Sequence, residues 1–183
     1  MKQETTVKYV LRLALTLFLI TAVVACCLAA VNMVTKPRIA QAKAEKAQKA
    51  IEAVLPGGGE EIQEYEDPSG IVSRVYGSPE GYAIEVNPSG FNGPITMMVG
   101  VSRDGEVLGI SIVTQTETAG LGAVSAAKTT AGETFRNQYT GLSGDLAVKK
   151  DGGSIDAITG ATITSRAVTA GVNAALACAA GLR

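Results

Sequence analysis

The segment best equipped for chemistry is residues 156–168, where hydroxyl side chains precede an apolar, alanine-rich stretch (DAITGATITSRAV). Serine and threonine at such a boundary commonly cap the free backbone N–H groups of a helix, and Gly160 suits the preceding turn. The same arrangement suits an anion, because free N–H groups and the positive end of a helix attract phosphate. A hydroxyl at this position can also hold a phosphate covalently. The residues alone therefore leave two interpretations open, a helix cap and a phosphate site.

Composition limits the chemistry that the rest of the chain can supply. The 183 residues include no histidine, which excludes Ser-His and Cys-His hydrolases and removes the commonest metal ligand. The three cysteines (Cys26, Cys27 and Cys178) lack the spacing of a zinc site and are too few for a four-cysteine iron–sulfur cluster. No metal site is expected, and the net charge of -1 argues against a nucleic-acid partner. Any redox chemistry needs an organic cofactor or one shared with a partner.

The N-terminal apolar segment predicts a membrane anchor. Residues 13–34 carry no charge, and at about 1.5 Å per residue roughly 22 helical residues span about 33 Å, the core of a bilayer. A cleaved signal peptide is the alternative, since residues 23–26 resemble a lipoprotein cleavage box that would leave Cys26 lipidated. The apolar run continues past Cys26 as far as Lys36, which favours a retained span. Basic residues lie on both sides of it, so composition leaves the orientation open.

The remaining patterns predict an α+β fold. Residues 35–54 are rich in helix formers, Pro37 suits a first turn or a kink, and residues 56–59 (PGGG) end the helix. The acidic run at 60–67 is interpreted as a solvated surface. Alternating patterns and an Asp-Gly turn predict an antiparallel sheet, which packs with a short helix and a C-terminal helix. The predicted strands are residues 71–76, 82–86, 95–102 and 106–113, and the predicted helices are residues 129–139 and about 164–180.

The heptapeptide TGATITS at 159–165, with Asp156 three residues earlier, resembles the flavinylation motif of the FMN-binding domain family. In that family the threonine of the S/T-G-A-T core is joined to FMN by a phosphoester bond, and Thr162 matches it. More widely, the chain resembles the G subunits of Rnf-type ion-translocating ferredoxin:NAD oxidoreductases. It is more distantly similar to the C subunits of sodium-translocating NADH:quinone reductases. The segments that carry the likeness are the anchor, residues 82–113, ETAGLG at 117–122, AVKKDGG at 147–153 and TGATITSRAV at 159–168.

The resemblance implies a set of cofactor-binding residues and no catalytic residue. Leu121 is expected to contact the isoalloxazine ring and Thr118 to donate or accept a hydrogen bond, although relatives often have proline where this chain has Ala119. Lys149 or Lys150 would neutralise phosphate or reduced flavin, and Asp156 would assist attachment. The full expected set is Thr162, Thr159, Gly160, Ala161, Ile163, Thr164, Asp156, Glu117, Thr118, Gly120, Leu121, Gly122, Lys149 and Lys150.

The resemblance also implies an organisation and a function. It predicts a cytoplasmic tail (1–9), a transmembrane helix (10–34), a juxtamembrane helix (35–56) and an FMN-binding domain (57–183) on the extracytoplasmic side of a bacterial plasma membrane. The chain is expected to be an electron carrier without independent catalysis, loaded by an FMN transferase and assembled with the other subunits of an Rnf-type complex. No G-x-G-x-x-G follows a predicted strand, so no nicotinamide site is expected. Two alternatives remain: a tethered flavoprotein outside such a complex, and a non-redox extracytoplasmic binding or sensor module.

Overall fold

The computed structural model describes residues 2–182, with side chains described from Lys8 onwards. The chain separates into two compact units, Met1–Glu45 and Lys46–Arg183. The first unit is helical. The second contains a five-stranded antiparallel sheet with helices on both faces, which confirms the predicted α+β fold.

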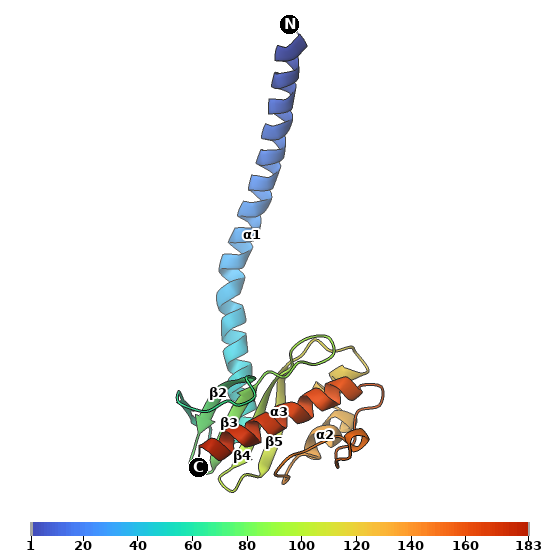
Figure 1. The fold of residues 1–183 in the computed structure, drawn as a ribbon. Helices are drawn as coiled ribbons and strands as arrows, with labels where there is room; N and C mark the ends of the chain where they lie inside the picture. Colours follow the sequence, from blue (N-terminus) through green and yellow to red (C-terminus); the bar gives the residue numbers. More distant parts are fainter. Residues whose placement is uncertain (1, 183) are drawn as a thin grey trace. The chain divides into compact units, whose positions relative to one another are not determined.

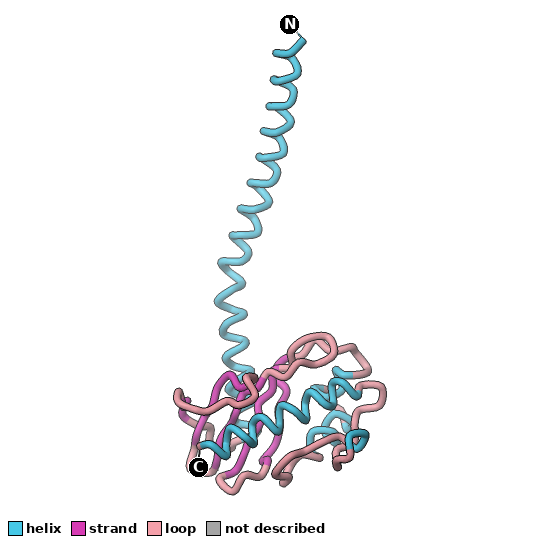
Figure 2. Tube along the Cα trace, viewed as in Figure 1, coloured by secondary structure: helices cyan, strands magenta, loops and turns pink. Residues whose placement is uncertain are grey.

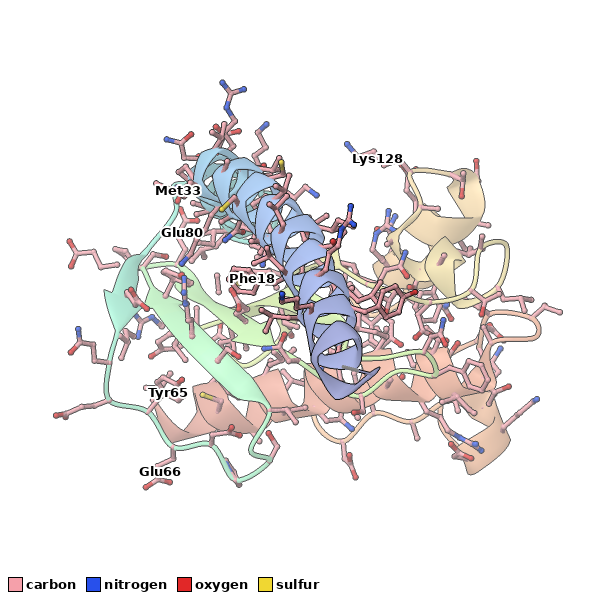
Figure 3. The ribbon with its side chains drawn as sticks, turned by 90° about the horizontal axis from the view of Figure 1, so that it is seen from above. Phe18, Met33, Tyr65, Glu66, Glu80 and Lys128 are labelled. Atoms are coloured by element: carbon pink, nitrogen blue, oxygen red, sulfur yellow. The ribbon has the colours of Figure 1, made fainter. Side chains whose placement is uncertain are left out.

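One helix, α1 (Lys2–Val54), covers the residues predicted as a tail, a span and a juxtamembrane helix. Pro37 lies inside it, so no new helix begins at this proline; strong helix formers on both sides sustain α1. Phe18 and Met33 project from α1 and are 70% and 78% exposed (Figure 3). In the described part of the chain, α1 is the one helix long and apolar enough to cross a membrane. The structure thus contains the apolar helix that an anchor requires, while the boundaries at 9, 34 and 56 stay predictions.

The sheet follows the order of the chain, β1-β2-β3-β4-β5, with every neighbouring pair antiparallel. The turn between β4 and β5 forms where predicted, and Gly105 adopts the φ of +88° that this turn requires. The acidic run lies largely exposed, as predicted, but its first residues also pair with β2 as a short edge strand that the sequence patterns did not indicate. Such a short, charged edge resists pairing with another chain. The strands are β1 (Glu60–Ile62), β2 (Val72–Gly77), β3 (Gly81–Val86), β4 (Thr96–Ser102) and β5 (Val107–Thr114).

One face of the sheet carries the main core, against helix α3 (Thr162–Gly181). Figure 1 shows α3 lying across the strands. The cross-strand neighbours Ile84, Val99 and Ile110 are buried beneath it. The small residues of α3 permit close packing: a Cβ on Gly171 would lie 3.0 Å from Pro88 Cγ. The helix begins at Thr162, two residues before the predicted start.

The last turns of α1, within the second unit, cover the opposite face of the sheet. Ile51, Val54 and Leu55 are buried there with Ala83 and Met98. Burying a side chain of this size stabilises a fold by about 1.5–3 kcal/mol. The end of α1 is therefore part of the folded domain as well as a connection to the anchor.

Three shorter elements complete the domain: η1 (Gly122–Ala126), α2 (Thr130–Asn137) and η2 (Lys149–Asp151). The predicted helix at 129–139 is confirmed as α2, which begins after the capping residue Thr129. Residues 149–151 form the one-turn η2, which is followed by Gly152 in the left-handed conformation. Figure 2 shows the loops around these elements gathered near the N-terminal end of α3. This end of α3 is where the candidate site lies.

Candidate cofactor site

The turn before α3 is held by Ser165, which lies outside the predicted set of cofactor-binding residues. Ser165 Oγ accepts a hydrogen bond from Ile158 N (2.9 Å) and donates one to Ala161 O (3.0 Å). Gly160, at φ +76°, provides the left-handed residue of the turn, and Ala161 N donates to Ile158 O (2.9 Å). Among the described residues, no side chain caps the first N–H groups of α3, and Ser165 instead holds the loop that precedes the helix. The signal was its position in the first turn of the helix.

Thr162 is the first residue of α3, and its hydroxyl takes no part in capping. The N-cap residue is Ala161, which has no side-chain cap hydrogen bond. Within the described part of the chain, the one hydrogen-bond partner of Thr162 Oγ1 is Lys150 Nζ, at 3.1 Å. Thr162 is half-buried. Its hydroxyl is thus placed at the positive end of a helix beside a cation, without serving the backbone.

The two neighbouring lysines have different surroundings. Lys149 Nζ forms an ion pair with Asp156 Oδ2 at 2.7 Å, and the two side chains are 60% and 67% exposed. An ion pair this exposed contributes at most about 1 kcal/mol. Lys150 instead reaches Thr162 from the same short η2 turn. The structure therefore distinguishes the two lysines that the sequence left equivalent: Lys150 lies at Thr162, and Lys149 does not.

Glu117 joins the three segments that surround Thr162. Its Oε2 accepts a hydrogen bond from Thr164 Oγ1 in the first turn of α3, and its Oε1 accepts one from Asn92 N (2.8 Å). The Phe91 backbone N–H also donates to the carboxylate. The side chain is only 8% exposed. Because these groups occupy both oxygens, Glu117 holds the walls of the site together.

Glycines on two sides make room for this carboxylate. A Cβ on Gly90 would lie 2.6 Å from Glu117 Oε1, and a Cβ on Gly122 would lie 2.6 Å from Oε2. Both distances are shorter than carbon–oxygen contacts allow. A side chain at either position would displace the Glu117 carboxylate or the groups that bind it, so both glycines favour its observed position.

The charge of Glu117 makes the stability of the domain sensitive to acid. Burial by itself raises the pKa of Glu117, but hydrogen bonds from Thr164, Asn92 and Phe91 outweigh it, so that the pKa is lower than in the unfolded chain. Such a group stabilises the fold at pH above its unfolded value of about 4.3. This contribution is lost as the pH falls through the lower folded pKa.

We expect the unfolding temperature of the wild type to fall more steeply between pH 5 and pH 3 than that of Glu117→Gln. The amide of the variant does not titrate, so its own contribution is independent of pH. Thermal unfolding of the full-length protein in detergent, across this pH range, measures the difference. Parallel pH profiles would mean that Glu117 has no depressed pKa in the folded protein.

A cavity of about 340 Å³ opens beside Thr162, lined by Phe91, Glu117, Thr118, Leu121, Gly122, Lys150, Gly160, Ala161, Thr162, Ile163 and Thr164. All but Phe91 belong to the set predicted from the sequence. Three predicted residues lie elsewhere: Gly120, Asp156 and Thr159 line a separate cavity of about 670 Å³. Lys149 lines neither of the two cavities. The structure therefore brings together most of the predicted set and separates the rest from it.

Phe91 was missed because a single aromatic residue in the segment GFNG resembles an ordinary surface loop. It is 65% exposed at the cavity, where Leu121 (42%) and Ile163 (50%) are also exposed. Large apolar side chains left in water beside a pocket commonly mark a ligand site. The cavity thus has an apolar part and, at Thr162 and Lys150, a part suited to an anion.

These features fit FMN. Its phosphate requires hydrogen-bond donors and a positive environment, which Thr162, Lys150 and the start of α3 offer. Its planar ring requires apolar surface, which Phe91, Leu121 and Ile163 offer. Gly160 lies beside Leu121 in the cavity lining, and a Cβ on it would lie 2.9 Å from Leu121 Cδ2. The absence of a side chain at Gly160 therefore leaves space between the apolar part of the cavity and the part suited to an anion.

Comparison with known proteins agrees with this geometry. Residues 90–177 match the FMN-binding domain family, and residues 1–54 match the RnfG N-terminal region. The chain is 35% identical to the G subunit of the Na(+)-translocating ferredoxin:NAD(+) oxidoreductase complex of Acetobacterium woodii, over 91% of this chain and 89% of that protein. It is 33% identical to the G subunit of the ion-translocating oxidoreductase complex of Pseudomonas aeruginosa strain UCBPP-PA14 (91% and 86% covered). The corresponding protein of Methanosarcina acetivorans is 31% identical (92% and 94% covered).

Fold and site together define an FMN-binding domain preceded by an apolar, membrane-compatible helix. The likeness extends over both parts and over nearly the whole length of the relatives. The chain belongs to the family of G subunits of Rnf-type ion-translocating oxidoreductase complexes.

Proposed function

We propose that this chain is an electron-transfer subunit of a membrane-bound ion-translocating ferredoxin:NAD oxidoreductase complex and carries FMN esterified to Thr162. The observation that carries the proposal is the position of the Thr162 hydroxyl. It lies at the start of α3, lines the cavity and contacts Lys150 instead of the backbone. The names of the relatives support the role in the complex.

Attachment requires an activated flavin donor, because condensing FMN with a hydroxyl in water would release water and is uphill. We propose a flavin–adenine dinucleotide as donor and a separate FMN transferase as catalyst. Thr162 Oγ1 attacks the flavin-side phosphorus, the new P–O bond forms and the pyrophosphate P–O bond breaks. AMP leaves with the electron pair, and the hydroxyl proton passes to a base of the transferase. The chain itself supplies the acceptor hydroxyl and a cation, Lys150, beside it.

After attachment, each part of the cavity has a different task. Lys150 and the start of α3 stabilise the phosphodiester charge, while Phe91, Leu121 and Ile163 offer apolar contact to the ring. Glu117 holds the cavity walls together through the hydrogen bonds that its carboxylate accepts from the surrounding segments. The bound isoalloxazine supplies the redox chemistry, and the protein supplies its position and electrostatic environment.

We further propose that residues 10–34 of α1 span the membrane and that residues 57–183 lie on the extracytoplasmic side. A covalent bond has a clear advantage there, since a dissociated flavin would be lost from an open compartment. The proposed neighbours are the other subunits of the complex, with which the flavin exchanges electrons.

Intact-mass spectrometry of the subunit purified from its own membranes tests the proposal. We expect the mass of the polypeptide plus one FMN phosphodiester, fragmentation that localises it to the peptide containing Thr162, and co-purification of ferredoxin- and NAD-reactive subunits. A flavin without those subunits would indicate a tethered flavoprotein outside such a complex. A subunit of unmodified mass would refute covalent attachment.

A further inference from the structure

Helix α2 is hydrogen-bonded on one side to the segment after ETAGLG and on the other to the loop before Thr162. Side chains at its C-terminal end are buried in the core. Phe135 and Tyr139 are 3% and 0% exposed and pack edge to face, with their ring centres 5.7 Å apart. Tyr139 OH is hydrogen-bonded to Thr169 Oγ1 of α3 at 2.9 Å. The residues between and beside these anchors are therefore fixed relative to α3.

Arg136 connects α2 to the segment that follows the ETAGLG loop. Its Nη1 donates to Ser125 O (2.6 Å), in η1, and to Ala127 O (3.1 Å). The η1 turn begins at Gly122, the last residue of ETAGLG. Arg136 therefore holds the C-terminal end of the ETAGLG loop in place against α2.

Gln138 connects the C-terminal end of α2 to residues 156–161, the loop that precedes Thr162. Its Oε1 accepts a hydrogen bond from Asp156 N (2.7 Å), and its Nε2 donates to Asp156 O (3.2 Å). One side-chain amide thus satisfies both backbone groups of a single residue, as a neighbouring strand would. This pair is directional, because only a group that donates on one side and accepts on the other can form it.

We propose that Gln138 is a positioning residue for flavin attachment: by holding the main chain of Asp156, it fixes the loop 156–161 so that Thr162 is presented to the transferase. Ser165 holds the later part of this loop through Ile158 N, whereas at Asp156 the other restraint is the exposed ion pair with Lys149, which is weak. Misplacement of a reacting group by about 1 Å can cost on the order of 10²-fold in rate. The inference depends on the proposed attachment to Thr162.

The test is the initial rate of flavin attachment to full-length protein, supplied with flavin–adenine dinucleotide and the transferase and followed by in-gel flavin fluorescence. We expect Gln138→Ala to lower kcat/KM about tenfold. Gln63→Ala removes an exposed glutamine of β1's flanking loop and should leave the rate unchanged. If the wild type takes up no flavin, the proposed function itself fails. If the wild type is loaded and Gln138→Ala matches it, the positioning role is wrong.

Gln138→Glu separates positioning from a merely structural role. A protonated carboxyl has one acceptor and one donor and can restore both hydrogen bonds to Asp156, whereas the carboxylate offers no donor. The rate of this variant relative to the wild type should therefore rise as the pH is lowered from 7 to 4.5, because a glutamate of ordinary pKa, about 4.3, protonates toward the lower end of this range. The same ratio for Gln138→Ala should stay constant. A flat ratio for Gln138→Glu would overturn the proposal, and this comparison also decides the case if Gln138→Ala fails to fold.

Discussion

Thr162→Ala is expected to abolish covalent flavin completely and to leave the domain folded. The variant lacks the only atom of this residue that can form a phosphoester, so no partial activity should remain. The fold should be nearly unaffected, because the Thr162 hydroxyl makes one hydrogen bond, to Lys150, and does not cap α3. Alanine is also a better helix former than threonine. We expect a change in the free energy of unfolding of no more than about 0.5–1 kcal/mol.

Two matched variants make this experiment specific. Thr159→Ala removes the other threonine of TGAT, which lines the separate cavity and should retain covalent flavin. Thr162→Ser keeps a hydroxyl and should still be loaded. Fluorescence in denaturing gels, after co-expression with the transferase, measures all three. Persistent flavin on Thr162→Ala would move the attachment point to another residue and refute the assignment.

Glu117→Ala is expected to cause the largest loss of stability among the site residues. The change leaves Asn92 N, Phe91 N and Thr164 Oγ1 without their common acceptor and opens a void between two glycines. Buried groups that lose a partner cost about 1–3 kcal/mol each, and water entering the void compensates part of this. We expect a destabilisation of about 2–4 kcal/mol, or a decrease in unfolding temperature of roughly 10 °C for a domain of this size.

Glu117→Gln is the matched control, since its amide keeps an acceptor for the loop at residues 91 and 92. It can also donate to Thr164 Oγ1, which then acts as acceptor. We expect less than half of the loss measured for Glu117→Ala, by thermal unfolding of the full-length protein at pH 7. If Glu117→Ala is as stable as the wild type, Glu117 does not hold the cavity walls together. Covalent flavin measured on the same samples would then show whether Glu117 contributes to attachment in another way.

Sequence patterns alone determined most of the helices and strands, and together with the family resemblance they identified most of the residues that line the cavity. An uncharged run of 22 residues must be helical to satisfy its backbone in a membrane. Alternating patterns around Asp104-Gly105 determined the hairpin, because side chains alternate between faces with a period of two. TGATITS and ETAGLG, together with Lys150 from AVKKDGG, contain ten of the eleven residues that line the 340 Å³ cavity. Alternation and turn residues were sufficient for the hairpin, whereas the cavity residues were identified through the resemblance of these motifs to the FMN-binding domain family.

Tertiary structure alone decided what each residue does within the site. Lys149 and Lys150 are equivalent in sequence, yet the one-turn η2 directs only Lys150 to Thr162. Glu117, expected among the cofactor-binding residues, lines the cavity, and its carboxylate also holds groups 25 and 47 positions away in the chain, a structural role that only the fold shows. Gln138 and Phe91 carry no local signal, because their partners come from other loops. Hydrogen bonds and packing between distant segments follow from the folded arrangement of the chain, which no window of neighbouring residues contains.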